Sequence, residues 1–109
     1  MSLQRLGGFD LAATTETMIY ECPDEHHATV SINLVARSGA PTVRLALTAS
    51  AAPAATDWLE YDLPLVAGGA PLLREGIAMF DGNRLYAYAS ATGVSVVAWG
   101  NAERVRRTT

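Results

Sequence analysis

The densest group of side chains that could carry chemistry is the segment 21–27, ECPDEHH. Its imidazoles, carboxylates and thiol are all groups that ligate zinc and related metals. Structural zinc sites, however, draw their ligands from two separated pairs, and this is one continuous run. The adjacent His26 and His27 would also point in opposite directions if a strand begins there. The spacing therefore favours a polar loop, and we predict no metal and no other cofactor.

Cys22 is the only cysteine, so the chain can form no intramolecular disulfide. As a nucleophile it would need His26 or His27 within hydrogen-bond reach as a base. No third orienting group and no oxyanion hole can be discerned, and a lone cysteine at a strand end is usually a small buried side chain. We predict that the protein is not an enzyme.

A second group of residues is centred on Trp58 in the segment WLEYDL, 58–63. Strict alternation places Glu60 and Asp62 on the same face as Trp58, with the two carboxylates roughly 7 Å apart along the strand. Paired carboxylates beside an aromatic ring are typical of glycoside hydrolases and sugar-binding grooves. A solvated sheet face has the same composition. If the segment binds sugar, Trp58, Glu60 and Tyr61 are the expected contacts.

Aromatic residues gather again near the carboxyl end of the chain. Tyr86, Tyr88 and Trp99 are expected on one side of a hairpin, opposite the small Ala87 and Ala89. Aromatic residues are enriched at the centres of protein interfaces. We predict an interface formed by Tyr86, Tyr88 and Trp99, together with Trp58 and Tyr61.

These side chains must be positioned by strands, because the hydrophobic pattern has a period of two. The stretch 81–100, DGNRLYAYASATGVSVVAWG, holds two alternating runs separated by a short break at 91–93. Gly93 can take a positive φ, so the two runs are expected to fold back as an antiparallel hairpin. A single pair of strands is not stable in water, and other strands must cover its apolar face.

The rest of the chain continues the same pattern, with turn signals at roughly the 8 to 12 residue spacing typical of sandwiches and barrels. Further strands are expected at 15–22, 28–37, 42–49 and 58–63, and 72–80 is either two short strands or one bulged strand. In 28–37 we expect Val30, Ile32 and Leu34 to share the buried face. In 42–49 we expect Val43, Leu45 and Leu47 to face inward and Thr42, Arg44 and Thr48 to face outward. The segment 50–56 is expected to be a loop, with one helical turn near Pro53 as an alternative. No stretch has the periodicity of a long amphipathic helix. The predicted fold is all-β, a single antiparallel β-sandwich of jelly-roll type.

One domain is expected in the 109 residues, from 12 to 103. Residues 1–11 are predicted to be an amino-terminal arm or a short first strand that crosses a neighbouring subunit, and 104–109 a basic carboxyl-terminal tail. The core is rich in alanine, which buries little apolar area, so association into a homo-oligomer, a trimer or a dimer, is expected.

The net charge of −3 offers nucleic acid no general attraction, although every basic residue is an arginine. No apolar run approaches the ~20 residues of a membrane-spanning helix, and the amino end lacks the pattern of a signal peptide. We therefore expect neither a nucleic acid nor a membrane partner, and synthesis in the cytoplasm.

The chain resembles a family of small structural proteins of tailed bacteriophages. The resemblance runs from about Ala12 to Glu103 and is carried by ATTETMIYECP, ATVSINLVARS, TVRLALTASAAPAATDWLEYDLPL and GIAMFDGNRLYAYASATGVSVVAWGNAE, in that order. It implies a β-sandwich component of the virion that has no catalytic residues. The family commonly has a small or basic turn after the first strand, whereas this chain has Asp24-Glu25-His26-His27. The resemblance therefore says nothing of what this loop contacts.

Together these observations predict a non-enzymatic virion protein that self-associates and binds other capsid or tail proteins, as a capsid cement (decoration) protein or a tail-associated component. The alternative is a carbohydrate-binding, receptor-recognition module of a tail fibre whose partner is a host glycan.

Overall fold

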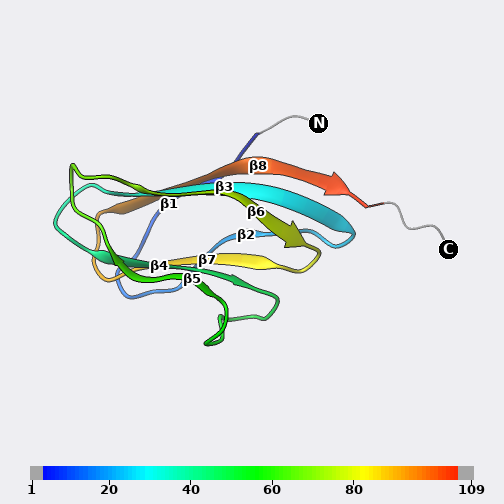
Figure 1. The fold of residues 1–109 in the computed structure, drawn as a ribbon, viewed down its shortest axis with the longest axis horizontal. Coiled ribbons are helices and arrows are strands. Elements are labelled where there is room, and N and C mark those ends of the chain that lie inside the picture. The colour runs from blue at the N-terminus through cyan, green and yellow to red at the C-terminus, as the bar shows by residue number, and fades with distance from the viewer. Residues whose placement is uncertain (1–3, 106–109) are drawn as a thin grey trace.

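The computed structural model describes residues 4–105, and eight strands and no helix occur in this range. The strands are β1 (Gln4–Asp10), β2 (Thr17–Glu21), β3 (His26–Ala36), β4 (Thr42–Thr48), β5 (Trp58–Pro64), β6 (Leu72–Phe80), β7 (Arg84–Ala89) and β8 (Val94–Arg104). They form two four-stranded antiparallel sheets, with the orders β1-β8-β3-β6 and β2-β7-β4-β5. Figure 1 shows the two sheets as stacked layers. The predicted all-β sandwich is confirmed.

Consecutive strands alternate between the two sheets almost throughout the described chain. Within it, β4 and β5 are the one pair that is both consecutive in sequence and hydrogen-bonded side by side. Eight strands wound in this way into two sheets make a jelly roll. The strand order therefore agrees with the predicted jelly-roll type.

The expected hairpin at 81–100 is wrong, because its two strands belong to different sheets. β7 pairs with β2 and β4, whereas β8 pairs with β1 and β3. The short turn between them steps across the sandwich, where Gly93 has φ +92° and its carbonyl accepts a hydrogen bond from the Arg37 N–H at 2.6 Å. Alternation identifies the two faces of a strand but not its neighbour, and a short turn can connect layers about 10 Å apart.

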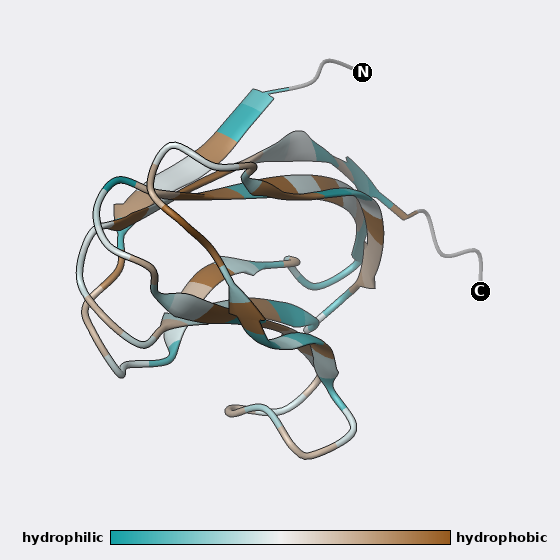
Figure 2. Ribbon diagram, turned by 60° about the vertical axis from the view of Figure 1, so that its left-hand side comes forward, coloured by the Kyte–Doolittle hydropathy of each residue, from teal (hydrophilic) through white to brown (hydrophobic). Residues whose placement is uncertain are grey.

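The core lies between the two sheets and is built from their inward-facing positions. Figure 2 shows hydrophobic segments on the strands of both layers. The fully buried members of the core on the central strands are Val30, Ile32, Leu34, Val43, Leu45, Leu85, Ala87, Ala89, Val94, Val96 and Ala98. The predicted inward faces of 28–37 and 42–49 are thus confirmed for Val30, Ile32, Leu34, Val43 and Leu45. Half-buried Leu47 packs at the edge of the same core.

Three segments with open alternatives are resolved by the structure. Gln4–Asp10 is a short first strand that pairs with β8, so it belongs to the sandwich rather than forming an arm outside it. The segment 72–80 is one bulged strand, with its register shift opposite Val30 and Ile32. The segment 50–56 is a loop. Arg104 ends β8, and the rest of the predicted basic tail lies almost entirely outside the described residues.

Candidate functional site

The 21–27 segment does not assemble the nucleophile and base that its composition allows. Cys22 is 1% exposed, and its thiol donates to the backbone carbonyl of His26 at 3.4 Å. The Nδ1 of His26 is 2.8 Å from the carbonyl oxygen of Asp24, and the ring of His27 packs edge-on against Phe80. Burial, and then the nearby charge of Asp81, raise the pKa of the Cys22 thiol. The thiol is therefore held in its protonated form, and both imidazoles have other partners.

Residues 4–105 contain no group of three or more His, Cys, Asp and Glu side chains that could hold a metal ion. Nor does this range contain a helix long and apolar enough to cross a bilayer.

The prediction that Glu60 and Asp62 share a face with Trp58 is wrong for Glu60. Glu60 pairs in register with the inward-facing Leu45 and forms an ion pair at 3.1 Å with Arg74 of the other sheet. Asp62 lies on the outer face, where it pairs with Arg44. The two carboxylates thus point to different sides of β5 and cannot act together as an acid and base.

Two register shifts in β5 cause this departure from alternation. Trp58 to Leu63 covers the same length as Val43 to Ala46, so β5 carries two extra residues against β4. Asp62 takes a positive φ of 53° within this stretch. Bulges of this kind re-aim side chains, and here they bring Trp58, Tyr61 and Asp62 onto one side of the strand.

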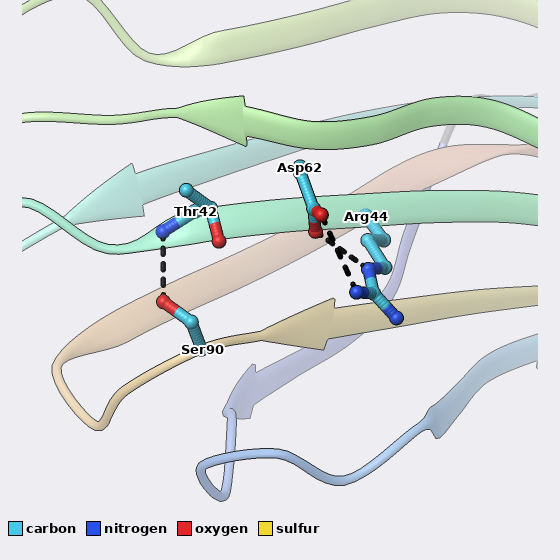
Figure 3. A network of polar contacts seen from close by, with 4 residues as sticks. All are labelled: Thr42, Arg44, Asp62 and Ser90. Carbon is cyan, nitrogen blue, oxygen red and sulfur yellow. Dashed lines mark hydrogen bonds and ion pairs between the residues drawn. The ribbon is translucent and has the colours of Figure 1, made fainter.

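The outer face of β4, β5 and β7 therefore holds a compact cluster, the aromatic corner, which consists of Arg44, Trp58, Tyr61, Asp62 and Tyr88. The guanidinium carbon of Arg44 lies 4.1 Å from the ring centre of Tyr61 and 4.5 Å from that of Tyr88. Arg44 Nε donates to Asp62 Oδ1 at 2.7 Å and Nη2 to Oδ2 at 3.4 Å (Figure 3). This hydrogen bond raises the pKa of Arg44, so the guanidinium stays charged.

Trp58 and Tyr61 meet edge to face, with their ring centres 5.3 Å apart. Together with Ala55 they line an open hollow of about 340 Å³. Tyr61 is 56% exposed, so much of its ring remains open to solvent. The hollow is thus a formed surface feature with one wall available to a ligand.

The wall that Ala55 provides belongs to the loop between β4 and β5, which projects from the outer side of its sheet (Figure 2). Tyr86 holds this loop, because its hydroxyl donates to the carbonyl of Ala51 at 2.5 Å. Within the loop, the Ala54 N–H donates to Asp57 Oδ2 at 2.7 Å. Tyr86 therefore anchors this loop, and its predicted role at an interface stays a prediction.

Trp99 lies on the opposite side of the molecule from Tyr86 and Tyr88. It is half-buried on the outer face of β8, where its neighbours in register are Ser31 and Arg5. The five predicted interface residues therefore separate into Trp99 on one sheet and Trp58, Tyr61, Tyr86 and Tyr88 on the other. A single aromatic patch containing Tyr86, Tyr88 and Trp99 does not exist, because their strands lie in different sheets.

Around Trp99, the outward side chains of 29–35 and 95–101 carry no charge, and Arg5 of β1, which pairs with Trp99, borders them. We call this uncharged surface the β3–β8 face, and it consists of the outward positions Thr29, Ser31, Asn33 and Val35 of β3 and Ser95, Val97, Trp99 and Asn101 of β8. Val35 and Val97 are exposed on it. Beside it, Leu73 of β6 is also exposed and pairs with Asn33.

Sequence reasoning missed Arg44 and the β3–β8 face as functional surfaces. A signal was present for Arg44, which is the one charged residue among the outward positions of 42–48. For the β3–β8 face the signal was the absence of charge at eight outward positions, interpreted only as solvated sheet. That β3 and β8 are neighbours could not be known before their pairing was seen.

No protein-family model, curated protein or solved structure matches this chain.

Proposed function

We propose that this chain is a non-enzymatic structural protein of a bacteriophage virion, which self-associates and binds other capsid or tail proteins through the β3–β8 face. The observation that supports this proposal is the uncharged centre of that face, which lies on the two longest strands of the molecule. Its location would be the virion, after synthesis in the host cytoplasm.

The distribution of charge around the face is that of a protein interface. Arg37 pairs with Asp10 beyond one end of β3, and Arg104 lies 3.6 Å from Glu25 at the other end. Interfaces typically have a centre depleted of charged residues and a polar, solvated rim. Trp99 at the centre is the kind of residue that contributes most to binding energy.

The outer side of the whole four-stranded sheet, whose centre is the β3–β8 face, is also of a suitable size. Strands β3 and β8 have 11 residues each, and at about 3.3 Å per residue and 4.8 Å between strands the four-stranded sheet measures roughly 36 by 19 Å. This is about 700 Å², close to the roughly 800 Å² that each partner buries in a standard interface. One sheet face can therefore support a specific contact between copies.

The virion assignment has two further supports. The resemblance to tailed-phage structural proteins extends over most of the chain, and the jelly roll is a fold that viral capsid proteins use, as lectins do. Because a fold hosts many functions, the contact surface has to be tested directly.

The test is the mass of the purified protein in solution over a range of concentrations, for the wild type and for Val97→Glu. The wild type should form a dimer or trimer. Val97→Glu should weaken association by about tenfold or more, because the contact would have to desolvate a carboxylate at its centre. Its folding stability should change by no more than about 0.5 kcal/mol, since the side chain is on the surface.

Val66→Glu is the matched control, because Val66 is exposed in the connection between β5 and β6, away from the face. It should leave the mass unchanged. A second measurement is labelling of the protein on intact particles. A wild type that is monomeric at every concentration and absent from particles would overturn the proposal, and so would equal effects of the two variants.

A further inference from the structure

The hollow of the aromatic corner combines an apolar platform with a polar fork. Tyr61 supplies the platform, Trp58 stands nearly perpendicular to it, and Ala55 completes the lining. The Arg44–Asp62 pair lies at the edge of the hollow, with the guanidinium carbon 4.1 Å from the ring centre of Tyr61 and 6.0 Å from that of Trp58. Two of the five guanidinium N–H groups are engaged by Asp62, and the others have no partner among the described residues. The oxygens of Asp62 retain further acceptor capacity, and its side chain is 46% exposed.

The charge of the site is balanced internally. The bidentate contact with Asp62 compensates Arg44, and Glu60, the other carboxylate of β5, is turned away to Arg74. An anionic ligand would meet the Asp62 carboxylate, and a cationic ligand would meet the Arg44 guanidinium. The chemistry therefore favours a neutral ligand that has both apolar C–H groups and hydroxyl groups.

The site is also held in place before any ligand arrives. Tyr61 and Tyr88 lie within 4.5 Å of the Arg44 guanidinium carbon, and Asp62 fixes its orientation. The Tyr86–Ala51 hydrogen bond restrains the loop that carries Ala55. Binding to a pre-organised site loses less conformational entropy, which matters most for a small, weakly binding ligand.

From this geometry we infer that the aromatic corner binds one neutral pyranose unit of a glycan. The apolar face of the sugar ring packs on Tyr61 and its edge meets Trp58, while adjacent hydroxyls donate to Asp62 and accept from Arg44. The hollow is at the lower end of the range of small-molecule sites, about 300–1,000 Å³, which suits a single ring rather than an enclosed oligosaccharide. The β3–β8 face lies on the other sheet, so sugar binding and self-association use separate surfaces.

The experiment is saturation-transfer-difference NMR and ¹H–¹⁵N shift titration with the methyl glycosides of glucose, galactose, mannose and N-acetylglucosamine. Methyl glucuronide and sialic acid serve as charged probes. At least one neutral glycoside should shift the amides of 58–62 and the indole N–H of Trp58, with weak affinity. The charged probes should bind more weakly than the neutral sugars.

Tyr61→Ala should lower the affinity about tenfold, because it removes the exposed wall of the platform. Phe80→Ala is the matched control, since Phe80 is exposed at the end of β6 in the other sheet, and it should have no effect. Asp62→Asn keeps a residue type that tolerates positive φ and leaves Arg44 uncompensated. It should weaken binding of the neutral sugar and strengthen binding of the glucuronide.

Absence of binding by every neutral glycoside at solubility-limited concentration would overturn the inference. Equal losses in Tyr61→Ala and Phe80→Ala would do so too. If Tyr61→Ala changes the oligomeric mass instead, the hollow is a protein contact and the sugar site is wrong. None of these results depends on the Val97→Glu experiment, so failure of one proposal leaves the other standing.

Discussion

Strands β3 and β8 pair continuously from His26↔Arg104 to Ala36↔Val94, whereas β4 and β5 shift register twice within four residues of β4. Between these ends the first pair presents a regular outer face of uncharged side chains that includes Trp99. The second pair gathers two aromatic rings and a carboxylate around a neighbouring guanidinium. The comparison shows how one sandwich forms two kinds of surface, an extended face where pairing is regular and a concentrated site where an edge strand bulges.

The continuity of the β3–β8 pairing depends on the backbone at Gly100, and this gives the largest expected effect. Gly100 has φ +153°, and a Cβ there would lie 2.1 Å from the carbonyl oxygen of Thr29. Gly100→Ala should lower the free energy of unfolding by about 3 kcal/mol or more, because the contact is with backbone in the middle of the sheet. Urea denaturation followed by tryptophan fluorescence measures it.

Gly39→Ala is the control for the effect of positive φ alone. Gly39 has φ +66°, and a Cβ at this position would have nothing within 4 Å of it, so the expected cost is only the backbone term of about 1–2 kcal/mol. Similar losses in both variants would show that the close approach of β3 and β8 at Gly100 contributes nothing.

A smaller effect on stability is expected from the hydrogen bond between Tyr86 and Ala51, which holds the β4–β5 loop to its sheet. Tyr86→Phe removes the hydroxyl that donates to Ala51 and should cost about 1 kcal/mol. Hydrogen exchange at 49–57 should accelerate, while exchange in β3 and β8 stays unchanged. Tyr88→Phe is the matched variant, because the Tyr88 hydroxyl has no hydrogen-bond partner among the described residues, and it should leave the loop as it is. Acceleration in both variants would refute the anchoring role.

The smallest effects on the free energy of unfolding are expected from removing ion pairs. The Arg44–Asp62 pair should contribute more than the exposed Arg104–Glu25 pair. Arg44→Met keeps the apolar stem and removes the guanidinium from between Tyr61 and Tyr88, so it should lower the urea midpoint slightly and shift the NMR signals of both rings. Arg104→Ala, whose side chain is 75% exposed, should give no measurable change. If Arg44→Met had the urea midpoint of the wild type and left the tyrosine signals unshifted, the guanidinium would not hold the residues of the aromatic corner together.

Sequence reasoning assigned side chains to the correct face where a strand is regular. It failed where pairing with a neighbouring strand introduces bulges that turn side chains to the other face. The faces of 28–37 were predicted correctly, since Val30, Ile32 and Leu34 are all fully buried. Glu60 was placed on the wrong face, because the two bulges of β5 exist only in relation to β4. Thr48 was expected to face solvent, yet it is 3% exposed, with its Oγ1 accepting a hydrogen bond from the Ser50 N–H as the following loop begins.

The candidate sites divide in the same way. The residue types of the aromatic corner were visible in the sequence, but their convergence was not, because Arg44 and Asp62 are 18 positions apart. Trp99 and Tyr86 seemed to share a surface because they are close in sequence, and the crossing between sheets separates them.

By itself the sequence determined that the chain forms strands and which side chains of the regular strands are buried. Both follow from local preferences and from a hydrophobic period that each strand carries independently of its neighbours. Only the tertiary structure decided which strands pair, where β5 bulges and which outward residues meet. These depend on hydrogen bonds and packing between segments far apart in the chain, and the same alternating pattern is compatible with several such pairings.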